Sequence, residues 1–279
     1  MACRGEVHNL TDVDILCLEK EVTDDEIKTA FFDMGPLKAP GCDGLHALFF
    51  QSQWDTVGES VCRMVKTVFT EGFPPAELNK TLLVLIPSKT YSHFRPISLC
   101  NVLYKLVIAN RLKPLMVKLI SPVQTSFVPG RKINDNILIA QGQRRKERGI
   151  MAVKIDLQKA YDRLHWDFVK DTLEDVGIPT ILIYIIMCCL YTCSMQILLN
   201  GQLTESFSTS RGVRQGDPLS PYLFVLCCVW SGCHNPFLFL MLWRKINGIL
   251  SRLAEQVLPF PISSFLMTWF FLQELLMIW

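Results

Sequence analysis

Two stretches decide the fold that we predict for this chain. They read MAVKIDLQKAYD at residues 151–162 and SRGVRQGDPLSP at residues 210–221. In the first, a short apolar run ends at Asp156, and a helical pattern that includes Tyr161 follows. A strand that presents a carboxylate at its end, beside a nucleotide pocket, suits metal-assisted phosphoryl transfer. The spacing therefore predicts a phosphoryl-transfer site around Asp156.

Both stretches resemble palm motifs of the reverse transcriptases of LINE-type (non-LTR) retrotransposons, those of plants in particular. Those motifs read K-x-D-x-x-K-A-[FY]-D and S-R-G-x-R-Q-G-D-P-L-S-P. Further matching stretches lie upstream: PLKAPGCDG at 36–44, LIP at 85–87, FRPISLCNV at 94–102 and FVPGR at 127–131. The resemblance covers roughly residues 26–227, which is most of the chain.

The resemblance implies an α+β fold with polymerase fingers and palm, in which an antiparallel sheet packs on helices. We expect an incomplete palm and no thumb. The expected domains are an acidic N-terminal segment at 1–35, a fingers-like part at 36–150, a partial palm at 151–228 and a hydrophobic tail at 229–279.

The resemblance also implies a set of site residues. Asp156 would be catalytic and would bridge two Mg²⁺ ions, although a lone Asp at a strand end also serves as a cap or turn residue. Tyr161 would pack under the nucleotide sugar, with core packing as the alternative. Gln215 and Gly216 would lie against nucleotide and template. The expected phosphate or nucleic-acid contacts are Arg95, Lys89, Lys159, Arg131, Arg211 and Arg214, with surface solubility as the alternative for the lysines.

Two expected metal ligands are missing. The family continues with a hairpin that bears two adjacent aspartates, but this chain has no aspartate after Asp217. It therefore holds one of the three expected carboxylates. The genetic code suggests a frameshift as the cause. If each codon is read from the third base of the preceding one, the bases that encode Met267-Thr268 give an aspartate codon. The same frame permits a second aspartate immediately before it. In this hypothesis the tail from about Val229 is out of frame, and sequencing the encoding DNA tests it.

Charge is unevenly distributed along the chain, although the net charge is only +2. Residues 1–33 carry nine acidic and three basic side chains, whereas residues 80–154 carry fourteen basic and two acidic ones. A basic stretch interleaved with aromatic residues suits binding to phosphate backbones, and a solvated face is the alternative. The predicted partners are an RNA template, a DNA primer and deoxynucleoside triphosphates (dNTPs).

Eleven cysteines with no C-x-x-C pair, and no signal peptide, predict reduced thiols in an intracellular protein of the nucleus or cytoplasm. No disulfide-linked partner is expected. The uncharged stretch 178–201 imitates a membrane span, but a buried helix followed by a strand and an Asn200-Gly201 hairpin explains it better, and no membrane partner is expected.

Local signals predict the other elements. Thr23 caps a helix at 23–34, apolar spacing predicts helices at 45–69 and 102–115, and 82–87 reads as a strand. An amphipathic helix should follow Ala160 and end at Gly177, and Ser220-Pro221 should open another.

The sequence predicts an RNA-directed DNA polymerase domain with little or no activity in this copy. Three alternatives stay open: a non-catalytic nucleic-acid-binding remnant, a small membrane protein, and a relative of group II intron maturases.

Overall fold

The computed structural model describes residues 9–87, 94–120, 127–132 and 159–233, and describes side chains up to residue 228. Several predicted features lie outside the described residues: Asp156 with the palm strand at 151–156, Lys89, and the tail beyond residue 233.

The chain divides into two compact units. One comprises Asn9–Leu115 and Lys159–Phe224, and the other comprises Met1–His8, Met116–Gln158 and Val225–Trp279. The described strands and most of the described helices belong to the first, which we call the main unit.

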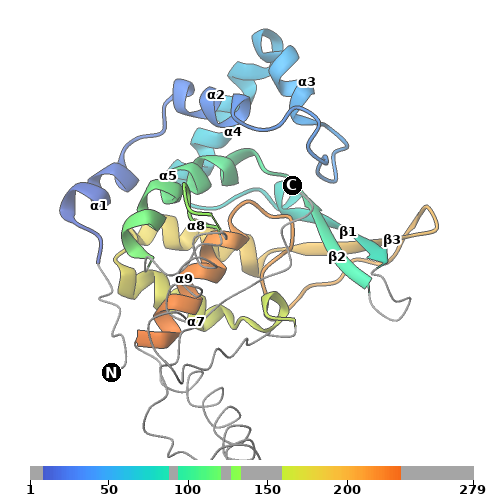
Figure 1. Cartoon of the computed structure of the whole chain (residues 1–279). Coiled ribbons are helices and arrows are strands. Elements are labelled where there is room, and N and C mark those ends of the chain that lie inside the picture. The colour runs from blue at the N-terminus through green and yellow to red at the C-terminus, as the bar shows by residue number, and fades with distance from the viewer. Residues whose placement is uncertain (1–8, 88–93, 121–126, 133–158, 234–279) are drawn as a thin grey trace, which may run out of the picture. The chain divides into compact units, whose positions relative to one another are not determined.

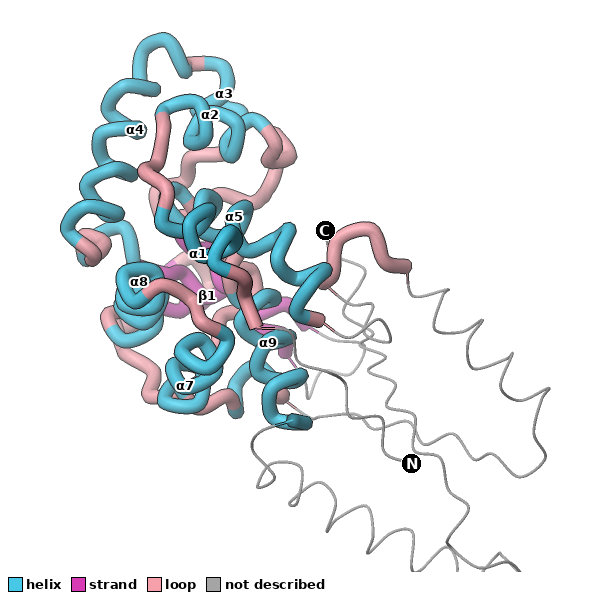
Figure 2. The backbone as a smooth tube through the Cα atoms, turned by 90° about the vertical axis from the view of Figure 1, so that its left-hand side faces the viewer, coloured by secondary structure: helices cyan, strands magenta, loops and turns pink. Residues whose placement is uncertain are grey.

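Four N-terminal helices begin the main unit: α1 (Asp12–Glu19), α2 (Asp24–Phe32), α3 (Ala47–Ser52) and α4 (Trp54–Glu71). Thr23 caps α2 as predicted, because its hydroxyl accepts a hydrogen bond from the Glu26 amide at 3.2 Å. Helices α2, α3 and α4 pack together at one end of the unit (Figures 1 and 2). The predicted single helix at 45–69 is wrong in one respect, since the chain breaks at Gln53 into α3 and α4.

The main unit contains a four-stranded sheet with the strand order β2-β1-β3-β4. Its strands are β1 (Lys80–Pro87), β2 (Phe94–Cys100), β3 (Ser194–Leu199) and β4 (Gln202–Leu203), and the short 3-10 helix η1 (Ala76–Asn79) leads into β1. The pairs β1–β2 and β3–β4 are antiparallel, but β1 and β3 run parallel. The predicted α+β class with a sheet packed on helices is confirmed, and the sheet itself is mixed where we expected an antiparallel one. Figure 1 shows the β3–β4 hairpin projecting from the helical part.

Asn200 and Gly201 turn that hairpin as the sequence predicts. Both have positive φ values, 50° and 80°, which is the combination that two-residue hairpin turns require.

Helices α5 (Leu103–Leu119), α7 (Trp166–Val176), α8 (Thr180–Tyr191) and α9 (Ser220–Cys233) and the 3-10 turn η2 (Tyr161–Arg163) complete the described elements. Helix α7 ends at Gly177, which has φ 88°, as predicted, but it begins only at Trp166. Helix α8 buries seven of its 12 residues and is about 18 Å long. In the described ranges, no helix is long and apolar enough to span a bilayer.

Candidate functional site

The two stretches that decided the prediction meet in the main unit. The Val213 amide donates to the Tyr161 carbonyl at 3.0 Å, and the Gly212 amide donates to the Leu164 carbonyl at 2.7 Å. The indole nitrogen of Trp166 donates to the Gly212 carbonyl at 2.8 Å. Segments about fifty residues apart in sequence are therefore joined backbone to backbone.

Gly212 allows this close approach. Its φ is +87°, and a Cβ placed there would lie 3.0 Å from the Cα of Asp162 and 3.1 Å from the Tyr161 carbonyl oxygen. A side chain at this position would separate the two segments, and a positive φ is costly for residues other than glycine. The glycine of the second stretch is thus required by the junction itself.

Tyr161 lies beside the same junction. Its ring stacks on Phe224, with centroids 4.6 Å apart and planes 21° apart, and the residue is 6% exposed. Offset or parallel stacking of this kind stabilises a fixed ring orientation. Lys159, two residues earlier, is exposed and has a φ of +54°. The packing of Tyr161 leaves its proposed contact with a nucleotide sugar as a prediction.

The Gln215–Gly216 turn is pressed against β2. The Ser98 amide donates to the Gln215 carbonyl at 2.7 Å, and a Cβ on Gly216 would lie only 2.6 Å from the Ser98 carbonyl oxygen. Gly216 has φ +108°, which only glycine adopts readily. The Oε1 atom of Gln215 is buried and has no hydrogen-bond partner among the residues that the structure describes.

Arg214 is a buried structural residue, which revises our prediction that it contacts phosphate. The residue is 6% exposed, and its Nη1 donates to Asn79 Oδ1 at 3.0 Å, to Thr81 Oγ1 at 3.2 Å and to Cys193 Sγ at 3.0 Å. Its Nη2 donates to the Cys189 carbonyl at 3.1 Å. Because that carbonyl belongs to the last turn of α8, the cation also complements the negative end of the helix.

Asp217 forms ion pairs with two buried cations, Lys105 and Arg214. Its Oδ2 accepts from Lys105 Nζ and from Arg214 Nη2, each at 2.9 Å, and its Oδ1 accepts from the Leu219 amide at 3.0 Å. Burial alone would raise the pKa of this carboxyl, but the charges of Lys105 and Arg214 outweigh burial and lower it to about 2. Asp217 is therefore ionised at neutral pH.

Lys105 was not predicted as a site residue. Its side chain is fully buried, and the Asp217 charge raises its pKa although burial and Arg214 act in the opposite direction. The available signal was a single lysine inside the apolar run of residues 102–109. A buried lysine requires a partner, but sequence alone does not identify a carboxylate 112 residues away.

Comparison with known proteins now bears on these contacts. The sequence model of the family described as "Reverse transcriptase (RNA-dependent DNA polymerase)" matches residues 86–231. That range includes both motif stretches and Arg214, Gln215, Gly216 and Asp217.

The chain belongs to the reverse transcriptase family.

Relatives narrow the type of reverse transcriptase. The chain is 32% identical over 246 residues to the "Transposon TX1 uncharacterized 149 kDa protein" of Xenopus laevis, covering 84% of this chain and 18% of that protein. It is 26% identical over 236 residues to the "Retrovirus-related Pol polyprotein from type-2 retrotransposable element R2DM" of Drosophila melanogaster, covering 81% of this chain and 22% of that protein. The chain thus spans about a fifth of the length of these relatives. The predicted reverse transcriptase domain of non-LTR type is confirmed.

The other predicted basic contacts of this reverse transcriptase domain lie in several places. Arg95 is exposed on β2 opposite Ile86 of β1, and Arg211 is exposed just before the junction at Gly212. Arg131 belongs to the other unit, where its Nη2 donates to the carbonyls of Ile120 at 2.9 Å and Val117 at 3.2 Å. Of these arginines, the structure places Arg95 and Arg211 at the surface of the main unit.

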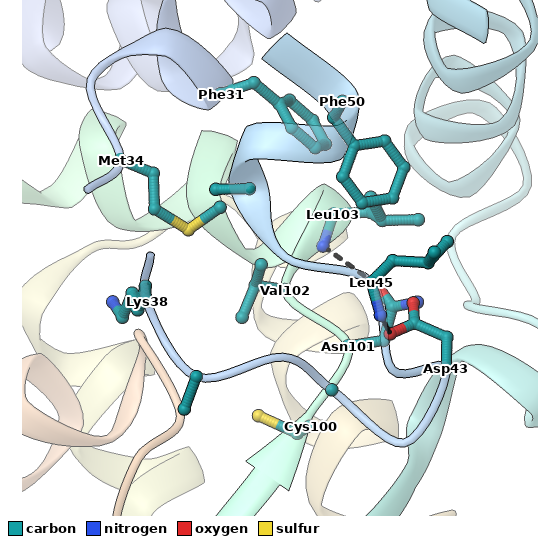
Figure 3. Close-up of a pocket in the computed structure, with 13 residues that line it drawn as sticks. Phe31, Met34, Lys38, Asp43, Leu45, Phe50, Cys100, Asn101, Val102 and Leu103 are labelled. Atoms are coloured by element: carbon teal, nitrogen blue, oxygen red, sulfur yellow. Dashed lines mark hydrogen bonds between the residues drawn. The ribbon is translucent and has the colours of Figure 1, made fainter. Parts of the chain in front are cut away.

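The upstream stretch at 36–44 packs against the start of α5 around a small cavity of about 20 Å³, enough for roughly one water molecule (Figure 3). The side-chain Nδ2 of Asn101 donates to Asp43 Oδ2 at 3.1 Å, and Asn101 Oδ1 accepts from the backbone amide of Leu103 at 3.1 Å. Lys38 also lines the cavity, and burial lowers its pKa. This stretch is therefore hydrogen-bonded to the residues between β2 and α5.

Proposed function

We propose that this chain derives from an RNA-directed DNA polymerase, which joins dNTPs to a DNA primer on an RNA template, and that this copy extends primers weakly or not at all. The observation that carries the proposal is the hydrogen-bonded junction between residues 161–164 and 212–213. It joins the end of the first motif stretch, at Tyr161, and the following Leu164 to Gly212 and Val213 of the second stretch. We also propose, from the motif resemblance alone, that the element is of plant origin.

In this proposal Asp156 is the catalytic carboxylate, and Tyr161 lies against the sugar of the incoming nucleotide. Gln215 and Gly216 form the surface that nucleotide and template contact, because Gly216 allows the backbone to approach closely. Exposed cations bind the phosphate backbone through charge. Those cations are Arg95, Arg211 and Lys159, with Lys89 and Arg131 as further candidates.

Magnesium is the metal that the family implies, and it prefers carboxylate oxygens. Among the described residues, no three Asp, Glu, His or Cys side chains converge in a way that could hold an ion. After Asp217 the sequence offers only Glu255 and Glu274 as carboxylates. The donor set assigned to this chain is thus Asp156 alone, which does not make a two-ion site, and we derive no catalytic step through the metal.

A frameshift before the second half of the palm accounts for that incomplete set. In this proposal the residues from about Val229 onward are translated out of frame, and the polypeptide is a shortened copy. We further propose that the protein acts within the nucleus or cytoplasm, where its template and primer are found.

Primer extension tests the catalytic part of the proposal. The full chain is incubated with an RNA template, an annealed DNA primer, dNTPs and magnesium, beside the Asp156→Ala variant. Extension by the wild type that Asp156→Ala abolishes supports a working polymerase with the assigned carboxylate. Extension that survives the substitution contradicts the assignment of Asp156.

The incomplete carboxylate set favours a second candidate, a nucleic-acid-binding remnant without catalysis. It predicts that the chain binds the same template and primer without extension, with an affinity that falls as salt rises. Arg95→Ala and Arg211→Ala should each reduce the slope of log affinity against log salt by roughly 0.9 for duplex DNA. The matched control is Arg63→Ala, because Arg63 is exposed on α4 and already pairs with Glu59 at 2.7 Å. A wild type that neither binds nor extends would refute both candidates.

A further inference from the structure

The residues on either side of the Gln215–Gly216 turn form a buried ion pair. Arg214 precedes the turn and Asp217 follows it, and the two side chains join across it at 2.9 Å. Both are buried, whereas Gln215 between them is partly exposed. A buried ion pair therefore joins the two ends of the turn.

We propose that the buried cluster of Lys105, Arg214 and Asp217 is a positioning device, which holds the Gln215–Gly216 turn in the geometry that binds nucleotide. The inference rests on the proposed function of that turn. None of the three residues touches the nucleotide in this proposal, so each acts through Gln215 and Gly216.

The cluster fixes the turn to four different elements. Lys105 connects Asp217 to α5, and Arg214 connects the turn to Asn79 of η1 and Thr81 of β1. Arg214 also binds the Cys189 carbonyl of α8. Because Asn79 Nδ2 donates to that same carbonyl at 2.9 Å, the anchors are themselves bonded to one another. A turn attached in so many directions has little freedom to shift.

The Gln215 side chain explains why such anchoring matters. Its buried Oε1 has no hydrogen-bond partner among the described residues, so no hydrogen bond to that oxygen fixes its direction. The position of the Gln215 side chain then depends on the backbone of the turn. The Ser98 amide donates to the Gln215 carbonyl at 2.7 Å, and the Arg214–Asp217 ion pair joins the residues before and after the turn. Loss of the ion pair should therefore make the Gln215 side chain more mobile while the protein stays folded.

Charge balance decides which substitutions test this idea. The cluster contains two cations and one carboxylate, so Asp217→Asn leaves two buried cations without a counter-charge and should lower the melting temperature strongly. The triple variant Lys105→Met, Arg214→Met, Asp217→Leu removes all three charges. Apolar replacement of a buried ionic cluster is often neutral for stability, so this variant separates positioning from folding.

The experiment measures hydrogen exchange of the Ser98 amide and the affinity for dATP in the presence of template and primer, both on the full chain. We expect the triple variant to melt within a few degrees of the wild type. We also expect its Ser98 amide to exchange at least about tenfold faster and its dATP affinity to fall by about tenfold, which corresponds to roughly 1.4 kcal/mol. The matched control is Lys66→Met, Asp24→Leu, which removes an exposed ion pair of 2.8 Å and should change neither quantity.

Three outcomes would overturn the proposal. A folded triple variant with wild-type Ser98 exchange and wild-type dATP affinity would show that the cluster does not position the turn. A triple variant that does not fold would show that the charges maintain the fold and not the turn. Faster exchange of the Ser98 amide with unchanged dATP affinity would show that the cluster has no effect on nucleotide binding. If the wild type itself fails to bind dATP, the proposed nucleotide contact of Gln215 and Gly216 is refuted separately, and exchange of the Ser98 amide still tests whether the cluster positions the turn.

Discussion

At the scale of single residues, Gly216 makes the closest backbone approach among the described glycines. An added Cβ would lie 2.6 Å from the Ser98 carbonyl oxygen, and φ is +108°. Gly216→Ala should lower the free energy of unfolding by about 3 kcal/mol, since steric overlap adds to backbone strain of roughly 1–3 kcal/mol. Urea unfolding measures this. The control is Gly201→Ala, where φ is +80° but the space is open, and equal losses at the two sites would contradict the close packing.

Asp217 gives the protein a predictable response to acid. Its folded pKa of about 2 lies below the ordinary value of 3.8, so its contribution to stability is complete above about pH 4 and disappears as pH falls through 2. Between pH 5 and pH 3 the loss from this group should be about 1 kcal/mol. The difference in unfolding free energy between the wild type and the triple apolar variant should shrink by that amount, and parallel pH profiles would disprove the assignment.

At the scale of elements, Arg111 connects its own helix α5 to three others, and its Nη1 donates to the Leu18 carbonyl of α1 at 2.8 Å. Its Nε and Nη2 donate to the two carboxylate oxygens of Glu26 on α2, at 2.7 and 2.8 Å, and its guanidinium lies 5.6 Å from the Phe69 ring of α4. Arg111→Lys should cost about 1–2 kcal/mol of unfolding free energy, because an ammonium cannot form the planar two-bond contact. Denaturant titration measures it. The control Arg63→Lys, in an exposed pair with Glu59, should change stability by less than about 0.5 kcal/mol; a similar loss there would undermine the argument.

Local chemistry predicted the elements wherever one residue decides the geometry. Thr23 capped α2, Gly177 ended α7, and Asn200-Gly201 turned the hairpin. The start of α7 was wrong, because the Leu164 carbonyl bonds to the Gly212 amide and does not enter a helix. Such a contact depends on a segment far away in the sequence and leaves no local signal.

The same distinction applies to the sheet and to α5. Parallel pairing of β1 with β3 joins residues more than a hundred positions apart, and no hydrophobic pattern records it. Helix α5 continues through Pro114 to Leu119, beyond the predicted end at 115. Proline inside a helix is costly, and here the surrounding packing outweighs that local preference.

At the scale of the whole molecule, the sequence identified the family and the turn that forms the candidate site, because both stretches are long and specific. It predicted a phosphate contact for Arg214 and did not single out Lys105, because the partners of these buried charges lie far away in the sequence. The buried ionic cluster is a property of the three-dimensional arrangement, formed by residues from α5 and from the second motif stretch.

The cysteines of the main unit provide a test of that arrangement. Cys17 and Cys42 are exposed, whereas Cys100, Cys189 and Cys193 are buried around the ionic cluster. Burial also raises the pKa of Cys42, and it raises that of Cys100 to about 11. Since the thiolate is the reactive form, iodoacetamide at pH 8 should label Cys17 first and Cys42 more slowly.

The three buried thiols should react only after the unit opens, at a rate set by unfolding. Peptide mass spectrometry of the full chain, with and without urea, resolves each position. Because Cys100 and Cys193 contact Asp217 and Arg214, at 3.7 and 3.0 Å, their protection reports directly on the cluster. Labelling of Cys100 in the native protein as fast as Cys17 would mean that the ionic cluster is open to solvent, and the positioning of Gln215 by buried charges would then be untenable.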